Sequence, residues 1–146
     1  MKVKGVLTVD SSVFIAALRP TEILHPPCRR LLEQIIEGRR EVFVPYSVLV
    51  EVVAAAFRRT GSRSFAHTVQ TQLLKAPSLH FVDLVKSRAC RASELATKVG
   101  LRGMDALVLQ VAQEMNGVLV TLDEELAEAA KGIVPSRTVN ALIKSS

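Results

Sequence analysis

Short apolar runs alternate along the chain with longer segments in which apolar residues recur every three or four positions. The short runs predict four buried strands, because they are rich in β-branched and aromatic residues: Val3–Val9, Glu41–Val44, Leu79–Asp83 and Val118–Thr121. Ile133-Val134 is consistent with a further strand at the edge of the sheet. Strands that alternate with helices favour an α/β fold with a central, mainly parallel sheet of four to five strands.

The longer segments predict helices. They are a helix from Val13 that Pro20 ends, then Cys28–Glu37, Val48–Arg59, Ser64–Lys75, Ser87–Val99, Met104–Met115, a helix that reaches Lys131, and Thr138–Ile143. Pro26-Pro27 is expected in the loop before the second helix. Ser11 or Ser12 is a suitable cap for the first helix, and Thr121 and Glu124 have the spacing of a capping box.

The length of 146 residues predicts a single domain over residues 1–146, with a core built from aliphatic side chains since aromatic residues are scarce. Asp10 interrupts the first apolar run before it reaches the length of a signal peptide. The longest apolar stretch, Val42 to Phe57, contains Pro45 and Glu51 and is too short to cross a bilayer. We therefore expect a cytoplasmic protein with no membrane partner.

Four acidic residues lie within or directly after the most apolar segments. Asp10 follows Val6–Val9, Glu51 is the only charge between Val48 and Phe57, Asp105 precedes Ala106–Leu109, and Asp123 follows Val118–Leu122. A lone ionised carboxylate in an apolar interior costs roughly several kcal/mol, so it is normally paired with a cation. None of the four has a Lys or Arg one helical turn away within its own apolar run. This pattern indicates a shared divalent-cation site.

The predicted elements also bring the four acids to one edge of the sheet. Asp10 and Asp123 fall at the carboxyl ends of strands, where open α/β sheets bind ligands. Glu51 and Asp105 are expected in the first turns of helices. Carboxylate oxygens suit Mg²⁺ or Mn²⁺, and such a metal can activate water and stabilise the leaving oxygen in displacement at phosphorus. Metal-dependent hydrolysis of a phosphodiester is the chemistry that this pattern favours.

The charge of the rest of the chain suits a polyanionic substrate. The whole chain has 19 basic and 14 acidic residues, and its pI is about 9.6. Four of the acidic residues are the carboxylates just described, so the remainder of the chain has an excess of positive charge. The candidates for contacts with nucleic-acid phosphates, or with an acidic partner, are Arg58, Arg59, Arg63, Lys98 and Arg102. Their alternative interpretation is that of solvated cations at helix ends, which the helix dipole favours.

Each acid also has a purely structural interpretation. Asp10 and Asp123 could cap the helices that follow them, and the helix dipole favours Asp105 near a helix start. Glu51 is harder to explain in this way, because its neighbours on every side of the helix are apolar. Phosphatases with an aspartate after the first strand require a second aspartate two residues later, a position that Ser12 occupies.

The four acidic segments resemble those of the PIN-domain nucleases, particularly the toxins of VapBC toxin–antitoxin systems. The segments that carry the resemblance, which covers nearly the whole chain, are Val9–Ser12, Pro45–Val52, Gly103–Ala106 and Leu119–Asp123. Each motif is short, and the order and spacing of all four make the match specific.

The resemblance implies a PIN-like three-layer α/β/α sandwich and a Mg²⁺- or Mn²⁺-dependent endoribonuclease. By the family pattern the metal ligands are Asp10, Glu51, Asp105 and Asp123. Ser11 or Ser12 would orient Asp10 or hold a phosphate, and Thr121 would lie behind the metal ligands. Members of this type commonly form homodimers and are silenced by an antitoxin that inserts a basic side chain into the acidic pocket.

Two further interpretations remain open. The chain could be an RNA-processing nuclease without an antitoxin, which the absence of a small antitoxin gene upstream would favour. It could also be a non-catalytic module that binds RNA or protein, although a degenerate member is expected to have lost a carboxylate and all four are present. Glu124 and Glu125 directly follow Asp123, and the sequence does not decide whether either joins the site.

Overall fold

A four-stranded parallel sheet forms the centre of the computed structural model, which describes residues 5–144. The strands are β1 (Leu7–Val9), β2 (Val42–Pro45), β3 (Leu79–Val82) and β4 (Val118–Val120). Their order is β3-β2-β1-β4, and all three pairings are parallel. The chain therefore extends the sheet to one side of β1 and then returns to place β4 on the other side.

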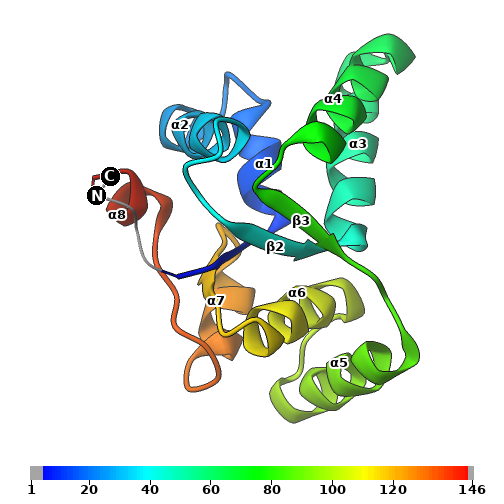
Figure 1. Cartoon of the computed structure of the whole chain (residues 1–146), viewed down its shortest axis with the longest axis vertical. Helices are drawn as coiled ribbons and strands as arrows, with labels where there is room; N and C mark the ends of the chain where they lie inside the picture. Colours follow the sequence, from blue (N-terminus) through cyan, green and yellow to red (C-terminus); the bar gives the residue numbers. More distant parts are fainter. Residues whose placement is uncertain (1–4, 145–146) are drawn as a thin grey trace.

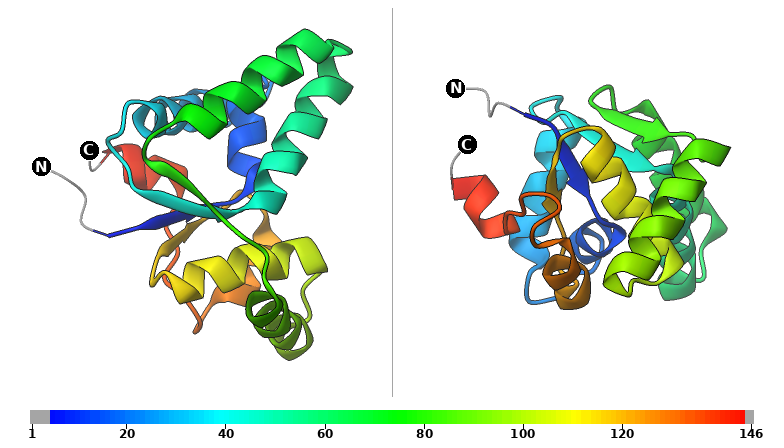
Figure 2. Two further views of the ribbon diagram at one scale, coloured as in Figure 1. Left: turned by 45° about the vertical axis from the view of Figure 1, so that its right-hand side comes forward. Right: turned by 90° about the horizontal axis from the view of Figure 1, so that it is seen from below.

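Helices cover both faces of this sheet, as Figures 1 and 2 show. One layer holds α1 (Ser11–Ala17), α2 (His25–Ile36), α3 (Tyr46–Thr60) and α4 (Arg63–Lys75), and the other holds α5 (Lys86–Val99), α6 (Gly103–Glu114) and α7 (Glu124–Ala130). The last helix, α8 (Val139–Lys144), packs beside α2. The expected α/β/α sandwich is confirmed.

The core is aliphatic, as the composition predicts. Val9, Val44, Leu109 and Leu119 are fully buried where the sheet meets its helices. None of the helices within residues 5–144 combines the length and the apolar character needed to cross a bilayer.

Two local predictions are wrong. Pro26 and Pro27 lie inside the first turn of α2, which begins at His25, because the first amides of a helix have no intrahelical acceptor and proline costs nothing there. Ile133-Val134 is not a strand, since both amides donate to the carbonyl of Ala130 and close the turn after α7. The chain reaches the sheet slightly later, where Leu119 pairs with Ser136 in an isolated bridge.

An ion pair joins the two helices of the second layer. The guanidinium of Arg88 on α5 donates from Nε and Nη2 to the two carboxylate oxygens of Glu114 on α6, each at 2.9 Å. Gln110 donates to the same carboxylate at 2.8 Å, and Arg88 also donates to the carbonyl of Asp83 at 3.0 Å. These hydrogen bonds, above all that from Arg88, lower the pKa of Glu114 to about 2.

This ion pair predicts an acid-dependent loss of stability. A carboxyl whose pKa is lower in the folded protein stabilises the fold above its ordinary pKa and loses that effect as the pH falls towards the folded value. We expect Glu114→Gln to lower the melting temperature at pH 7 and to flatten its decline between about pH 4.5 and pH 2. Circular dichroism melts against pH test this. Glu94→Gln is the control, because the Glu94 carboxylate takes part in no ion pair within residues 5–144; an equal change in both variants would contradict the prediction.

Candidate active site

A cavity of about 370 Å³ opens at the carboxyl edge of the sheet, where the strand order reverses between β1 and β4. It is lined by Asp10, Ser11, Ser12, Ile15, Glu51, Arg102, Met104, Asp105 and Asp123. All four acids singled out in the sequence line this one cavity, including three of the four aspartates in the chain. Ile15 and Met104 form an apolar wall of the cavity that was not predicted from the sequence.

Asp10 is held by hydroxyl groups. It precedes α1 directly, but its carboxylate makes no capping hydrogen bond, and neither Ser11 nor Ser12 is the N-cap residue. Oδ2 of Asp10 instead accepts from Ser12 Oγ at 2.8 Å and from Thr121 Oγ1 at 2.9 Å. Within the described chain Oδ1 takes part in no hydrogen bond, so one carboxylate oxygen is oriented and the other is available to a ligand.

The same hydroxyls connect the ends of β1 and β4. Ser12 Oγ accepts from the amide of Leu122 at 3.0 Å, and Thr121 Oγ1 accepts from the amide of Asp123 at 3.0 Å. Thr121 is therefore not the cap of α7, contrary to the capping-box prediction. Asp123 caps this helix itself, because its Oδ1 accepts from the amides of Glu125 at 2.9 Å and Leu126 at 3.3 Å. Asp123 thus has both of the roles considered from the sequence, since it caps a helix and lines the cavity.

Glu51 enters the cavity from α3. The helix begins at Tyr46, so Glu51 lies in its second turn and not in the first turn as expected. Burial raises the pKa of this carboxyl, and the negative charges of Asp10 and Asp105 raise it further, while a hydrogen bond with the Ser11 hydroxyl acts in the opposite direction. The two neighbouring acids are therefore close enough for their charges to act on Glu51.

Asp105 lies in the first turn of α6, as expected. Burial also raises its pKa, followed by the charges of Asp123 and Asp10, and the nearby Arg102 offsets part of this effect. Glu51 and Asp105 thus both hold their protons more tightly than free carboxyls do. The cavity is a region of like charge that an external cation would stabilise.

Of the five basic residues considered as RNA contacts, Arg102 alone is among those that line the cavity. Its Nε lies 4.0 Å from Oδ2 of Asp105, and its Nη2 lies 3.9 Å from Oε2 of Glu125. Arg59 donates to the carbonyl of Leu18. The remaining three, Arg58, Arg63 and Lys98, are exposed on helix ends outside the cavity.

Glu124 and Glu125 do not line the acidic cavity. They line a neighbouring open hollow of about 560 Å³ between the end of α5 and α7. Glu125 approaches the site only through its contact with Arg102 and through its charge, which contributes to the raised pKa of Asp105.

The oxygen donors of the cavity suit Mg²⁺ or Mn²⁺. Within residues 5–144 no three Asp, Glu, His or Cys side chains stand close enough to surround one ion in their present positions. Mg²⁺ does not require such a cage, because it is usually held by one or two carboxylates and completes its shell with water and substrate oxygens. The unused Oδ1 of Asp10 and the repulsion within the cavity fit this type of binding, and Asp10, Glu51, Asp105 and Asp123 are the residues that could provide it.

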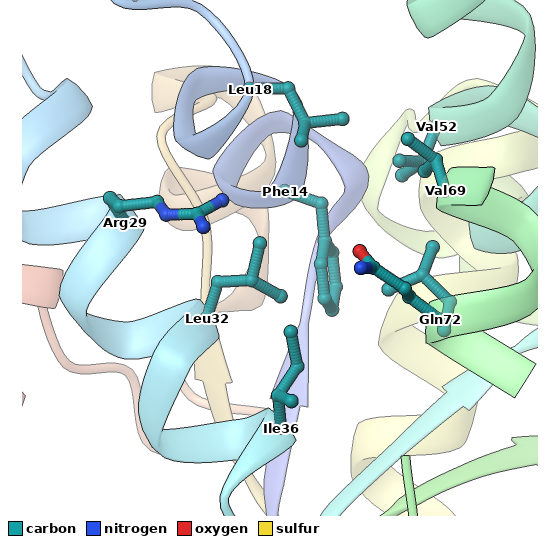
Figure 3. Close-up of a pocket in the computed structure, with 9 residues that line it drawn as sticks. Phe14, Leu18, Arg29, Leu32, Ile36, Val52, Val69 and Gln72 are labelled. Carbon is teal, nitrogen blue, oxygen red and sulfur yellow. The ribbon is translucent and has the colours of Figure 1, made fainter. Parts of the chain in front are cut away.

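A second cavity has a different character. Figure 3 shows it between α1, α2, α3 and α4, where Phe14, Leu32, Ile36 and Val69 form its walls and Arg29 and Gln72 contribute polar groups. Its volume is only about 20 Å³, room for about one water molecule. It offers no set of acid, base or nucleophile for chemistry.

The family model of the PIN domain matches residues 7–132, a range that contains all four acids. The chain belongs to the PIN domain family. Among curated proteins no match to this PIN domain was found.

Solved structures with this fold include toxins. VapC20 of Mycobacterium tuberculosis, a toxin that cleaves the sarcin-ricin loop, superposes with a TM-score of 0.71 at 19% identity, over 90% of this chain and 98% of that one. A toxin–antitoxin complex from Klebsiella pneumoniae gives 0.65 at 17% identity, over 91% and 97%. VapBC2 from Rickettsia felis, bound to promoter DNA, gives 0.63 at 15% identity, over 91% and 98%. At these identities the likeness establishes a shared fold.

Burial, with the neighbouring negative charges, raises the pKa of Glu51, which predicts that removing this carboxylate stabilises the PIN domain when no metal is bound. A carboxyl with a raised pKa costs stability when it ionises, so the cost is present above the folded pKa and absent below the ordinary one. In EDTA at pH 7 we expect Glu51→Gln to raise the free energy of unfolding, because the raised pKa of Glu51 makes its ionised form unfavourable in the folded protein. Urea unfolding measures the change, with Glu94→Gln as the exposed control. Destabilisation by Glu51→Gln in EDTA would show that the carboxylate is structural.

Proposed function

We propose that this PIN domain is a metal-dependent endoribonuclease that hydrolyses phosphodiester bonds in RNA, and that it acts as the toxin of a type II toxin–antitoxin system. The observation that carries the proposal is the single cavity lined by Asp10, Glu51, Asp105 and Asp123 with one exposed arginine at its rim. Burial and neighbouring negative charge raise the pKa of Glu51 and Asp105 in this cavity, which argues for a functional role of the cluster.

The donor set supports Mg²⁺ or Mn²⁺ as the cofactor. When bound, the metal would supply Lewis-acid stabilisation of the charge on the phosphate and would make water a better nucleophile. Water attacks phosphorus, the bond to the leaving oxygen breaks, and that oxygen takes a proton. We propose the cytoplasm as the place of this activity.

The chain's own residues prepare the site for this reaction. Ser12 and Thr121 fix the orientation of the Asp10 carboxylate by binding one of its oxygens. The first turn of α7 fixes Asp123 through its capping bonds, and the Ser11 hydroxyl offsets part of the rise in the pKa of Glu51. Their role is to hold the carboxylates in place before metal and RNA arrive, which lowers the cost of assembling the reactive complex.

The partner we propose is an antitoxin. The related folds from K. pneumoniae and R. felis come from a toxin–antitoxin complex and a VapBC pair, which supports a similar partner for this chain. A basic side chain of the antitoxin would compensate the negative charge of the acidic cavity, as a bound metal would. We also propose a homodimer, and the exposed Tyr46, Val50, Leu84 and Val85 provide apolar surface for such contacts.

Loss of cleavage in an Asp10 variant tests the function. We expect the wild-type protein to cleave a mixed single-stranded RNA pool with Mg²⁺ or Mn²⁺ but not in EDTA, and Asp10→Asn to lower the rate roughly 100-fold or more. Asp83→Asn is the matched control, because Asp83 is the remaining aspartate of the chain and lies outside the cavity. Equal metal-dependent rates for wild type and Asp10→Asn would contradict the proposal.

The hydroxyl of Thr121 predicts a second, graded effect. Thr121→Val keeps the shape of the side chain but removes the donor to Asp10 and the acceptor for the Asp123 amide. Loss of such a supporting group typically lowers metal affinity or activity about 10- to 100-fold. Thr121→Ser keeps the hydroxyl and should retain most of both. Calorimetric titration with Mn²⁺ and RNA cleavage measure the effect, and equal loss in the two variants would contradict the role of the hydroxyl.

A further inference from the structure

Arg102 is the cation that the fold places on the wall of the acidic cavity. Its backbone is fixed as the N-cap residue of α6, since its carbonyl accepts from the amide of Ala106 at 3.0 Å. Its side chain is 80% exposed, so the guanidinium can move while its base stays in place. Arg102 thus has a fixed backbone and an exposed, charged side chain three residues before Asp105 in the sequence.

The contacts that hold the guanidinium are weak. The distances to Asp105 and Glu125, 4.0 Å and 3.9 Å, are longer than hydrogen bonds. Arg102 and Glu125 are each 80% exposed, and although Asp105 is only 17% exposed, water and salt reach the guanidinium and screen both ion pairs, so they contribute little to stability. The Arg102 side chain therefore has a resting position beside the two carboxylates that it can leave at small cost.

We propose that Arg102 is a phosphate-binding residue of the site, which pairs with Asp105 and Glu125 before a divalent metal binds and turns to a phosphate of the RNA strand once the metal engages Asp105. This inference rests on the proposed ribonuclease function. It gives Arg102, one of the basic residues considered from the sequence, a specific role. It also implies that Arg102 competes with the metal for the Asp105 carboxylate.

The charges at the site support this exchange. A bound metal would compete with Arg102 for the Asp105 carboxylate, so metal binding would leave the arginine with Glu125 as the remaining one of these two partners. A phosphodiester that enters the cavity meets four acidic side chains, and one metal ion offsets only part of their charge. Arginine suits the remaining task, because its planar fork binds two phosphate oxygens at once.

Three variants separate this role from a structural one. Arg102→Gln removes the charge, Arg102→Lys keeps the charge but not the fork, and Arg30→Gln removes an exposed arginine on α2 that lies outside the cavity. Each is assayed by calorimetric titration with Mn²⁺ alone, by melting in EDTA, and by kinetics of cleavage of a single-stranded RNA at several KCl concentrations.

We expect Arg102→Gln to bind Mn²⁺ about two- to five-fold more tightly, because the competing cation is gone. Its kcat/KM for RNA should fall about ten-fold or more, mainly through KM, and the slope of log KM against log salt concentration should decrease by about 0.7, the loss of one phosphate contact to a single strand. Arg102→Lys should keep the salt slope with an intermediate kcat/KM, and Arg30→Gln should match the wild type.

Two results would overturn the proposal while leaving the ribonuclease in place: wild-type kcat/KM and salt slope in Arg102→Gln, or a joint loss of Mn²⁺ affinity and melting temperature, which would make Arg102 structural. Absence of metal-dependent RNA cleavage by the wild-type protein would overturn the proposed function, and the assignment of Arg102 with it.

Discussion

The burial of acidic side chains beside one another in a single cavity is the constraint on which the rest of this structure depends. The parallel sheet brings Asp10 and Asp123 to one cavity, because β1 and β4 pair directly and end at the same edge. The two helical layers then bring Glu51 and Asp105 to the same point from opposite faces. Burial raises the pKa of both acids that lie on helices, Glu51 and Asp105. The aliphatic core provides the stability that offsets the cost of gathering these acids.

The groups around the cavity differ in whether they orient a carboxylate or compensate its charge. Ser12 and Thr121 orient Asp10 without adding charge, and they connect β1 to β4 by the same bonds. The Arg88–Glu114 pair holds α6 against α5 and so fixes the helix that carries Asp105. Full charge compensation inside the cavity is left to a ligand from outside, which is the property expected of a site that binds metal or a basic partner.

Much of this was accessible from the sequence, because the strongest signals were energetic. A carboxylate in an apolar run is costly wherever the chain folds, so Asp10, Glu51, Asp105 and Asp123 could be singled out without coordinates. The strands and most helix ends followed from residue patterns and glycine stops such as Gly61 and Gly100, both of which adopt the left-handed conformation at helix ends.

The misses were local and depended on which partner a polar group chooses. Thr121 has the spacing of a cap but donates to Asp10, which directly follows the neighbouring strand β1, and Asp123 caps α7 instead. Ile133-Val134 has strand-forming residues, yet its amides close a turn. Nor does spacing distinguish Arg102 from other basic residues at helix ends, because only the folded chain shows which one borders the cavity.

The most direct test of the account is to locate the metal itself. Crystals grown with MnCl₂ and measured near the manganese absorption edge should show an anomalous peak in the cavity, with Oδ1 of Asp10 and an oxygen of at least one other acid about 2.1 Å away. A crystal saturated with Mn²⁺ that shows no peak between these carboxylates, or shows peaks only elsewhere, would contradict the claim that the four acids form a metal-binding site.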